Sequence, residues 1–319
     1  MTSAQADACP PPLARNCVTV IRVDGLAVDH DGRTVALDLQ RHSPGEVRQK
    51  HHGNVPAGYV GPYFVPEMPK VNLPIPPRPD QPRVKLHLHL GDMISFNERH
   101  AVYNVRVTRA DPPAFYIPPL VIKVAQTDEA GRLLPKEAAM YEHIRKLQGV
   151  VAPRFYGYFH AKNRSSEWTR ISPRGSTSDT DELDADEGSP FLDDEEEPEP
   201  APEGPPACTR MDILLLEKVG EHLPHGEQMS TQDIFDLRDM YHDLSRMHVD
   251  HFDYHAANVT YAPLSPPGLP GKRSPYHKRV YGLRLIDFEG AQLTTRTPMH
   301  QRKLVQEHLP GLLSDIMAL

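Results

Sequence analysis

Two short stretches decide the expected fold: residues 251–259 read HFDYHAANV, and residues 283–291 read LRLIDFEGA. The first places Asp253 five residues before Asn258, and the second places Asp287 at the end of an apolar run, where a strand should meet a loop. Mg²⁺ prefers carboxylate and amide oxygens as ligands. Phosphoryl transfer needs such ligands, together with one carboxylate that orients or accepts the proton of the attacking hydroxyl. The pair of stretches therefore indicates phosphoryl transfer, although Asp253 and Asn258 also suit simple turns.

A cation that could contact phosphates lies upstream in the predicted strand PLVIKVA, residues 119–125. Lys123 sits in the middle of this run, and a buried lysine is costly without a carboxylate partner. Glu137, on the predicted helix of residues 135–149, is the expected partner, and Glu142 on the same helix is the alternative. Lys123 has a simpler interpretation too, as a strand residue whose charged end reaches solvent.

The order of these motifs resembles the protein kinase-like fold. It runs V-I-K, a helical glutamate, the hinge-like ILLLEKVG, then H-x-D-x-x-x-x-N and I-D-F. The segments EAAMYEHIRKLQG, PRFYGYF and IDFEGAQL resemble divergent kinase-like proteins common in fungi, and they are similar to aminoglycoside-phosphotransferase-like kinases. The resemblance covers roughly residues 83–319 without an acidic insert.

This resemblance implies a two-lobed α+β fold, with a small antiparallel-sheet lobe and a mainly helical, truncated large lobe. It also implies ATP and Mg²⁺ as cofactors and a hydroxyl acceptor, either protein Ser/Thr or a small molecule. Lys123 would contact the nucleotide phosphates with Glu137 steadying it, Asp253 would be the catalytic base, and Asn258 and Asp287 would hold the metal.

Three departures from the family pattern bear on activity. Ser95, Asn97 and His100 occupy the expected glycine-rich loop, where side chains would crowd the phosphates. Glu289 replaces the glycine of the magnesium motif, which could alter the loop or add a carboxylate ligand. Only residues 292–319 follow that motif region, so a platform for peptide substrates is not expected.

Composition divides the chain into four regions. Residues 1–82 form an N-terminal extension, with a possible hairpin from CVTVIRV and TVALDLQ and a proline-rich linker. Residues 83–160 form the small lobe. Residues 161–207 form an acidic insert expected to be disordered. Residues 208–319 supply the last small-lobe strand, the hinge and the short large lobe, ending in one or two helices.

Charge and composition exclude several classes. Residues 175–207 hold 13 acidic side chains and no Lys or Arg, so the net charge of −8 becomes −8 + 13 = +5 without them. A mildly basic body suits a nucleotide, but it has no dense basic stripe for nucleic acid. No run reaches the ~18 apolar residues of a membrane span. Three cysteines without metal spacing, and a start that lacks a signal-peptide pattern, predict an intracellular protein, cytoplasmic or nuclear.

Two alternatives stay open. The missing glycines fit a catalytically weak pseudokinase that serves as a nucleotide-binding or interaction module, with the acidic insert docking a basic protein partner. His251, Asp253 and His300 also match the two-His-one-carboxylate ligands of non-haem iron oxygenases. Those enzymes use a β-rich double-sheet fold, which fits poorly with the helices expected here.

Overall fold

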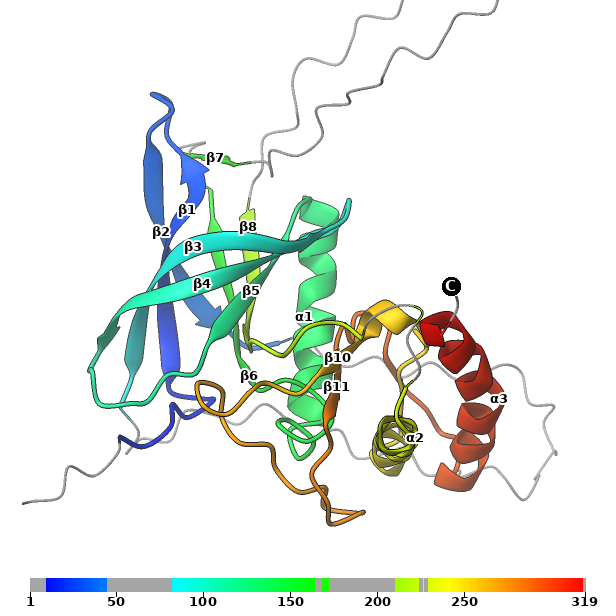
Figure 1. The fold of residues 1–319 in the computed structure, drawn as a ribbon. Coiled ribbons are helices and arrows are strands. Elements are labelled where there is room, and N and C mark those ends of the chain that lie inside the picture. Colours follow the sequence, from blue (N-terminus) through cyan, green and yellow to red (C-terminus); the bar gives the residue numbers. More distant parts are fainter. Residues whose placement is uncertain are drawn as a thin grey trace, which may run out of the picture.

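The computed structural model describes residues 10–44, 82–163, 168–171, 210–223, 226 and 229–317. Eight strands make up its main sheet: β1 (Val18–Val28), β2 (Thr34–His42), β3 (Val84–Phe96), β4 (His100–Asp111), β5 (Leu120–Ala125), β6 (Phe155–Lys162), β7 (Thr169–Arg170) and β8 (Arg210–Glu217). A helix between β5 and β6 packs beside this sheet, and the remaining elements follow β8 in the chain (Figure 1).

The sheet closes on itself into a barrel. Its strand order is β2-β6-β8-β5-β4-β3-β1, and β1 pairs back with β2, so seven strands form a ring, with β7 added at β1. Six of the seven junctions are antiparallel, and β1 runs parallel to β3. Side chains alternate along each strand: Leu120, Ile122 and Val124 of β5 enter the barrel core, while Val121 and Ala125 face outward into a second core.

The prediction of a two-lobed kinase-like fold is wrong. The hairpin expected from CVTVIRV and TVALDLQ does form, as β1 and β2, but it completes the barrel instead of standing apart in an extension. The described part of the chain contains three α-helices, and short β-pairs accompany the two that follow the barrel, so a mainly helical large lobe is not present either. The error arose because strand pairing joins residues far apart in sequence, and local periodicity carries no information about the partner.

Helix α1 (Asp128–His143) covers the outer face of β5, β6 and β8 (Figure 1). It begins earlier than predicted, because the Thr127 side chain accepts a hydrogen bond from the Ala130 backbone and acidic residues fill the first turn. Pro135 therefore lies inside the helix and does not mark its start. The buried face of α1 contributes Leu134, Met140 and other apolar residues to the core against the barrel wall.

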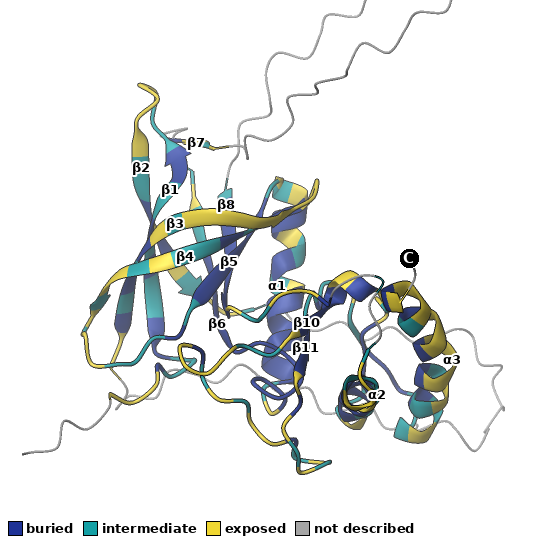
Figure 2. Cartoon of the chain, viewed as in Figure 1, coloured by how far each residue is buried: buried dark blue, intermediate teal, exposed yellow. Residues whose placement is uncertain are grey.

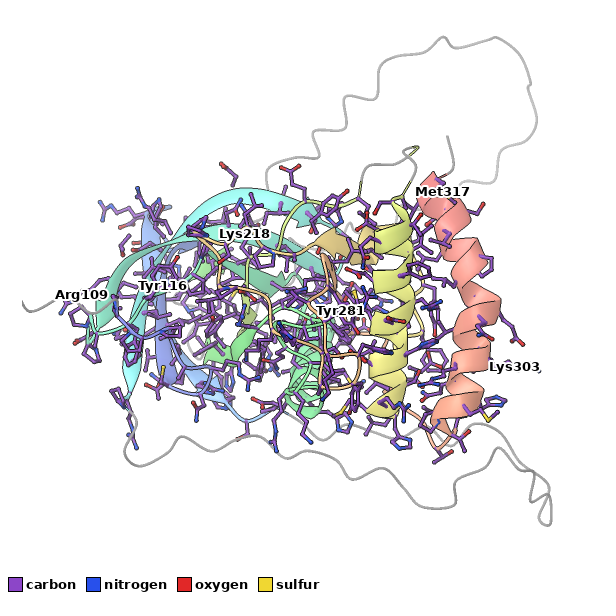
Figure 3. The ribbon with its side chains drawn as sticks, turned by 60° about the horizontal axis from the view of Figure 1, so that its bottom comes forward. Arg109, Tyr116, Lys218, Tyr281, Lys303 and Met317 are labelled. Atoms are coloured by element: carbon purple, nitrogen blue, oxygen red, sulfur yellow. The ribbon has the colours of Figure 1, made fainter. Side chains whose placement is uncertain are left out.

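The chain after β8 packs against the far side of α1. It contains α2 (Thr231–Arg246), β9 (Val249–Asp250), η1 (Ala256–Asn258), β10 (Val259–Tyr261), β11 (Leu283–Leu285), β12 (Gln292–Leu293) and α3 (Pro298–Met317). Helix α2 stands between the barrel and α3, on which Lys303 and the last residue of the helix, Met317, are labelled (Figure 3). Four residues predicted at helical spacing, Val305, Leu309, Leu312 and Ile316, are buried on α3, and its other face is exposed (Figure 2).

The proline-rich linker predicted up to residue 82 and most of the acidic insert lie outside the described residues. At the borders of the insert, β6 extends to Lys162, and Thr169–Arg170 form β7 against β1. Among the helices that the structure describes, none has the length and apolar character needed to cross a membrane.

Candidate functional site

The centre of the site is a buried lysine held between two carboxylates. Because Lys123 occupies an outward position on β5, its side chain reaches the space between the barrel wall and α1. Its Nζ donates to Glu137 Oε2 at 2.8 Å and to Asp287 Oδ1 at 2.8 Å. The Lys123 side chain is 8% exposed, that of Glu137 is 1% exposed, and that of Asp287 is 37% exposed. The pairing of Lys123 with Glu137 is confirmed, while Glu142 lies 3.8 Å from Arg41 instead.

The three charges influence one another strongly. Burial opposes the charge on Lys123, but the carboxylates of Glu137 and Asp287 outweigh it, so the pKa of this lysine is raised. Burial raises the pKa of Glu137 to about 7 even though Lys123 acts in the opposite direction, and the second oxygen of Glu137 has no hydrogen-bond partner. Burial alone would raise the pKa of Asp287, yet Lys123 holds it below its usual value. Lys123 is therefore a fixed cation with one solvent-facing carboxylate beside it.

The loop after β11 positions Asp287. The Ile286 backbone N–H donates to the Asn258 carbonyl at 3.0 Å, and the Asp287 backbone adopts a left-handed conformation with φ of 58°. The next side chain, Phe288, is buried and packs edge-on against Tyr141 of α1, with ring centroids 5.2 Å apart. A non-glycine residue in the left-handed region is strained and is often found at functional sites. In this conformation the Asp287 carboxylate accepts a hydrogen bond from Lys123.

Asn258 and Asp253 lie on the neighbouring loop. Asn258 is buried at the end of η1, and its side-chain amide lies 3.4 Å from the Asp253 carbonyl oxygen, which it donates to. The Asp253 carboxylate is exposed, where an acceptor could approach it. His251 is buried between these loops: its Nε2 donates to the Ile286 carbonyl at 3.0 Å, and burial lowers its pKa. His251 thus has a structural role that joins the two loops.

The β3–β4 turn brings Arg99 and His100 to this site, a contact that the sequence did not predict. At the β3–β4 turn, the Asn97 side chain accepts from the backbone N–H groups of Arg99 and His100, at 2.9 and 2.7 Å. This turn brings Arg99 within 3.5 Å of Glu289 and His100 Nδ1 within 3.3 Å of it. Burial and then Lys123 lower the pKa of His100 to about 4, so the ring is neutral at neutral pH. The segment where the resemblance places a glycine-rich loop therefore contacts Glu289, the residue that replaces glycine in the magnesium motif.

The site thus brings together Lys123, Glu137 and Asp287 directly, with Asn258 joined to the Asp287 loop by a backbone hydrogen bond. In the described structure Lys123 pairs with Glu137 and Asp287 and makes no hydrogen bond or ion pair with Asp253, whose carboxylate is exposed at the solvent side of this cluster.

Iron ligation by His251, Asp253 and His300 has no geometric support. In the described ranges, one group of three His, Cys, Asp or Glu residues has its ligand atoms within 4.8 Å of one another, and it consists of Asp239, His242 and His277. Arg238 and Arg279 already contact the Asp239 carboxylate of this group at 3.3 and 2.9 Å.

No protein-family model matches the chain, and the comparison with curated proteins also found no match. The case for a function therefore depends on the residues and their geometry.

Proposed function

We propose that the protein is an ATP- and magnesium-dependent phosphotransferase that acts on a hydroxyl acceptor. The observation that carries this proposal is the position of Lys123, whose ammonium lies 2.8 Å from both Glu137 and Asp287. A lysine fixed in this way presents a permanent cation beside a carboxylate that solvent can reach. Phosphate oxygens next to a metal ion need this combination. These roles follow the motif order of kinase-like proteins, whereas a barrel replaces their two-lobed fold.

The oxygen donors fit a magnesium ion. Asp287 has one oxygen on Lys123, which leaves its second oxygen for a metal, and Asn258 adds an amide oxygen close to the same loop. Asp287 and Asn258 would hold the ion, which would neutralise charge on the nucleotide phosphates. Lys123 would bind the phosphates directly, and Glu137 would keep the lysine oriented and charged.

Asp253 would act on the acceptor. Its carboxylate is exposed, and Asn258 hydrogen-bonds the Asp253 carbonyl, which limits the positions that the carboxylate can take. A carboxylate in this place can accept the hydroxyl proton as the phosphoryl group transfers. Both a protein Ser/Thr and a small molecule remain candidate acceptors.

Three Asp→Asn variants test these roles. Asp287→Asn should remove the magnesium-dependent part of ATP affinity and leave some metal-free affinity. Asp253→Asn should leave ATP affinity unchanged but lower turnover by about a hundredfold or more, because a general base contributes to the chemical step. The control is Asp31→Asn at the exposed β1–β2 turn, which should change neither quantity. Equal loss of ATP affinity in all three variants, or in none, would contradict the assignment.

A second candidate function is nucleotide binding without transfer, as in a pseudokinase. It is favoured by the β3–β4 turn, where Arg99 and His100 contact Glu289 and no glycine frees the backbone to surround phosphates. In that case the same variants would show the binding effects without turnover in any protein. The acidic segment would then be the docking site for a basic protein partner, a proposal that lies outside the described residues.

A further inference from the structure

A large pocket lies apart from the Lys123 site, at the end of the barrel near the C-terminus of α1. Its volume is about 580 Å³, and it is bounded by residues 12–16, residues 269–272, and side chains from β2, α1 and the segment entering β6. None of its lining residues belongs to the candidate phosphotransferase site. A cavity of this volume falls in the range of small-molecule sites. We refer to it as the basic pocket.

The walls of the basic pocket are fixed by hydrogen bonds. The Leu13 backbone N–H donates to the Tyr116 carbonyl at 2.9 Å, and the Tyr116 hydroxyl donates to the Pro267 carbonyl. On the opposite side, Arg154 donates to the Pro270 carbonyl at 2.6 Å. The segments around residues 12–16 and 269–272 are thereby held to the barrel from both sides. A ligand would enter a preformed site and would not have to order its walls.

Positive charge is in excess inside the basic pocket. Four cationic side chains line it, namely Arg15, Arg41, Arg154 and Lys272, against one lining carboxylate, Glu142. Arg154 is paired with Glu217, and Arg41 lies 3.8 Å from Glu142. Within the part of the chain that the structure describes, Arg15 and Lys272 have no carboxylate within ion-pair distance.

The cationic groups show the effect of this imbalance. Arg15 Nη1 donates to the Arg145 carbonyl at 3.0 Å and to Gln148 Oε1 at 2.6 Å, and both of these acceptors are uncharged. Burial, and then the neighbouring Arg15 and Arg154, lower the pKa of Lys272. Burial likewise lowers the pKa of Arg15. Glu142 acts on Arg15 in the opposite direction but lies beyond ion-pair distance of it, and Lys272 is exposed at the pocket. A partly buried cation without an ion-pair partner is costly, and an anion bound between Arg15 and Lys272 would offset that cost.

From this geometry we propose that the basic pocket binds a small polyanion that carries phosphate or carboxylate groups. Lys272 would supply a point charge with rotatable donors, and Arg15 a planar fork suited to two oxygens of one acid group. The volume exceeds that of a single inorganic ion, so we assign a ligand with at least two acid groups. This site does not depend on phosphotransferase activity.

Calorimetric titration with two probes tests the assignment, namely inorganic pyrophosphate for phosphate groups and citrate for carboxylate groups, both without added metal. The variant is Lys272→Gln, which removes the charge while keeping a polar side chain of similar reach. The matched control is Lys303→Gln, on the exposed face of α3, away from the barrel (Figure 3). Thermal unfolding of each variant establishes that it is folded.

Wild-type protein and Lys303→Gln should bind at least one probe with equal affinity, and that affinity should fall about tenfold in Lys272→Gln, which loses a hydrogen bond to a charged group. The probe with the higher affinity identifies the preferred acid group. Unchanged affinity in Lys272→Gln would show that the probe binds elsewhere, for example at Lys123. That result, or the absence of binding to wild type at millimolar concentrations of both probes, would overturn the proposal.

Discussion

Removal of the Lys123 cation should destabilise the protein sharply at neutral pH. Lys123→Met keeps most of the side-chain volume but leaves Glu137, which is 1% exposed, without its only hydrogen-bond donor among the described residues. At the observed 2.8 Å, each Lys–carboxylate attraction amounts to about 6 kcal/mol at an effective dielectric constant of about 20. Desolvation of the lysine cancels much of this, so the expected net loss in the free energy of unfolding is about 3 kcal/mol.

The origin of that loss can be isolated with a second substitution. In Lys123→Met/Glu137→Leu the buried carboxylate is gone as well. The free energy of unfolding should therefore be about 2 kcal/mol higher than in Lys123→Met, since apolar replacements of a buried ion pair are often neutral. Asp287 also loses its ion pair with Lys123, but its side chain is 37% exposed, so water can solvate the carboxylate. The control is Lys85→Met on β3, which breaks a half-exposed pair with Asp38 at 3.0 Å and should cost at most about 1 kcal/mol.

The loss of stability in Lys123→Met should also depend on pH, and the titration of Glu137 decides the direction of that dependence. Its pKa of about 7 in the folded protein lies above the value of an unfolded glutamate, so its protonated form favours the folded state, and that stability is lost as the pH rises through the folded pKa. Without Lys123 this pKa rises further. The cost of Lys123→Met should therefore be smaller at about pH 5, where Glu137 is protonated in both folded proteins, and should grow above about pH 7.

Urea-induced unfolding, followed by circular dichroism, measures the free energy of unfolding across this pH range. The four proteins compared are wild type, Lys123→Met, Lys123→Met/Glu137→Leu and Lys85→Met. If Lys123→Met lowers the free energy of unfolding by less than about 1 kcal/mol at about pH 8, as Lys85→Met should, Glu137 does not depend on Lys123 as a partner. Loss of the partner of a buried carboxylate should lower stability by more than this.

Other substitutions test how the site is positioned. Phe288→Ala should lower the free energy of unfolding by about 3–5 kcal/mol, because the ring is buried against Tyr141 and His251; urea unfolding measures this, and a loss under 1 kcal/mol would contradict the packing. Thr127→Ala should cost about 1 kcal/mol through loss of the N-cap of α1, as measured by thermal unfolding, and no change would indicate a later helix start. Asn97→Ala should loosen the β3–β4 turn and speed amide hydrogen exchange there; unchanged exchange would show that its hydrogen bonds do not hold the turn.

Local sequence patterns predicted individual elements well. The alternating runs around residues 84–96 and 100–111 are strands, PLVIKVA is β5, and TQDIFDLRDMYHDLSR is α2. These signals are local, because a strand or helix exposes its periodicity within a few residues. The start of α1 was missed because Pro135 suggested a first turn, whereas the N-cap at Thr127 decided it.

Long-range relations were predicted only in part. The Lys123–Glu137 pair could be expected, since a strand lysine next in sequence to an amphipathic helix needs a partner and Glu137 is close in the chain. Closure of the barrel could not, because the parallel pairing of β1 with β3 joins residues on either side of a long proline-rich stretch. The contacts of Glu289 with Arg99 and His100 could not be predicted either, since the β3–β4 turn and the loop after β11 are far apart in sequence and meet only in the folded protein.

The central claim is that Lys123, Glu137 and Asp287 form a nucleotide phosphate site. Calorimetric titration of wild-type protein with ATP, with and without magnesium, tests it most directly. We expect saturable binding at millimolar ATP or below, several-fold stronger when magnesium is present, because Asp287 faces solvent beside a fixed cation. Absence of ATP binding at millimolar concentrations under both conditions would contradict it.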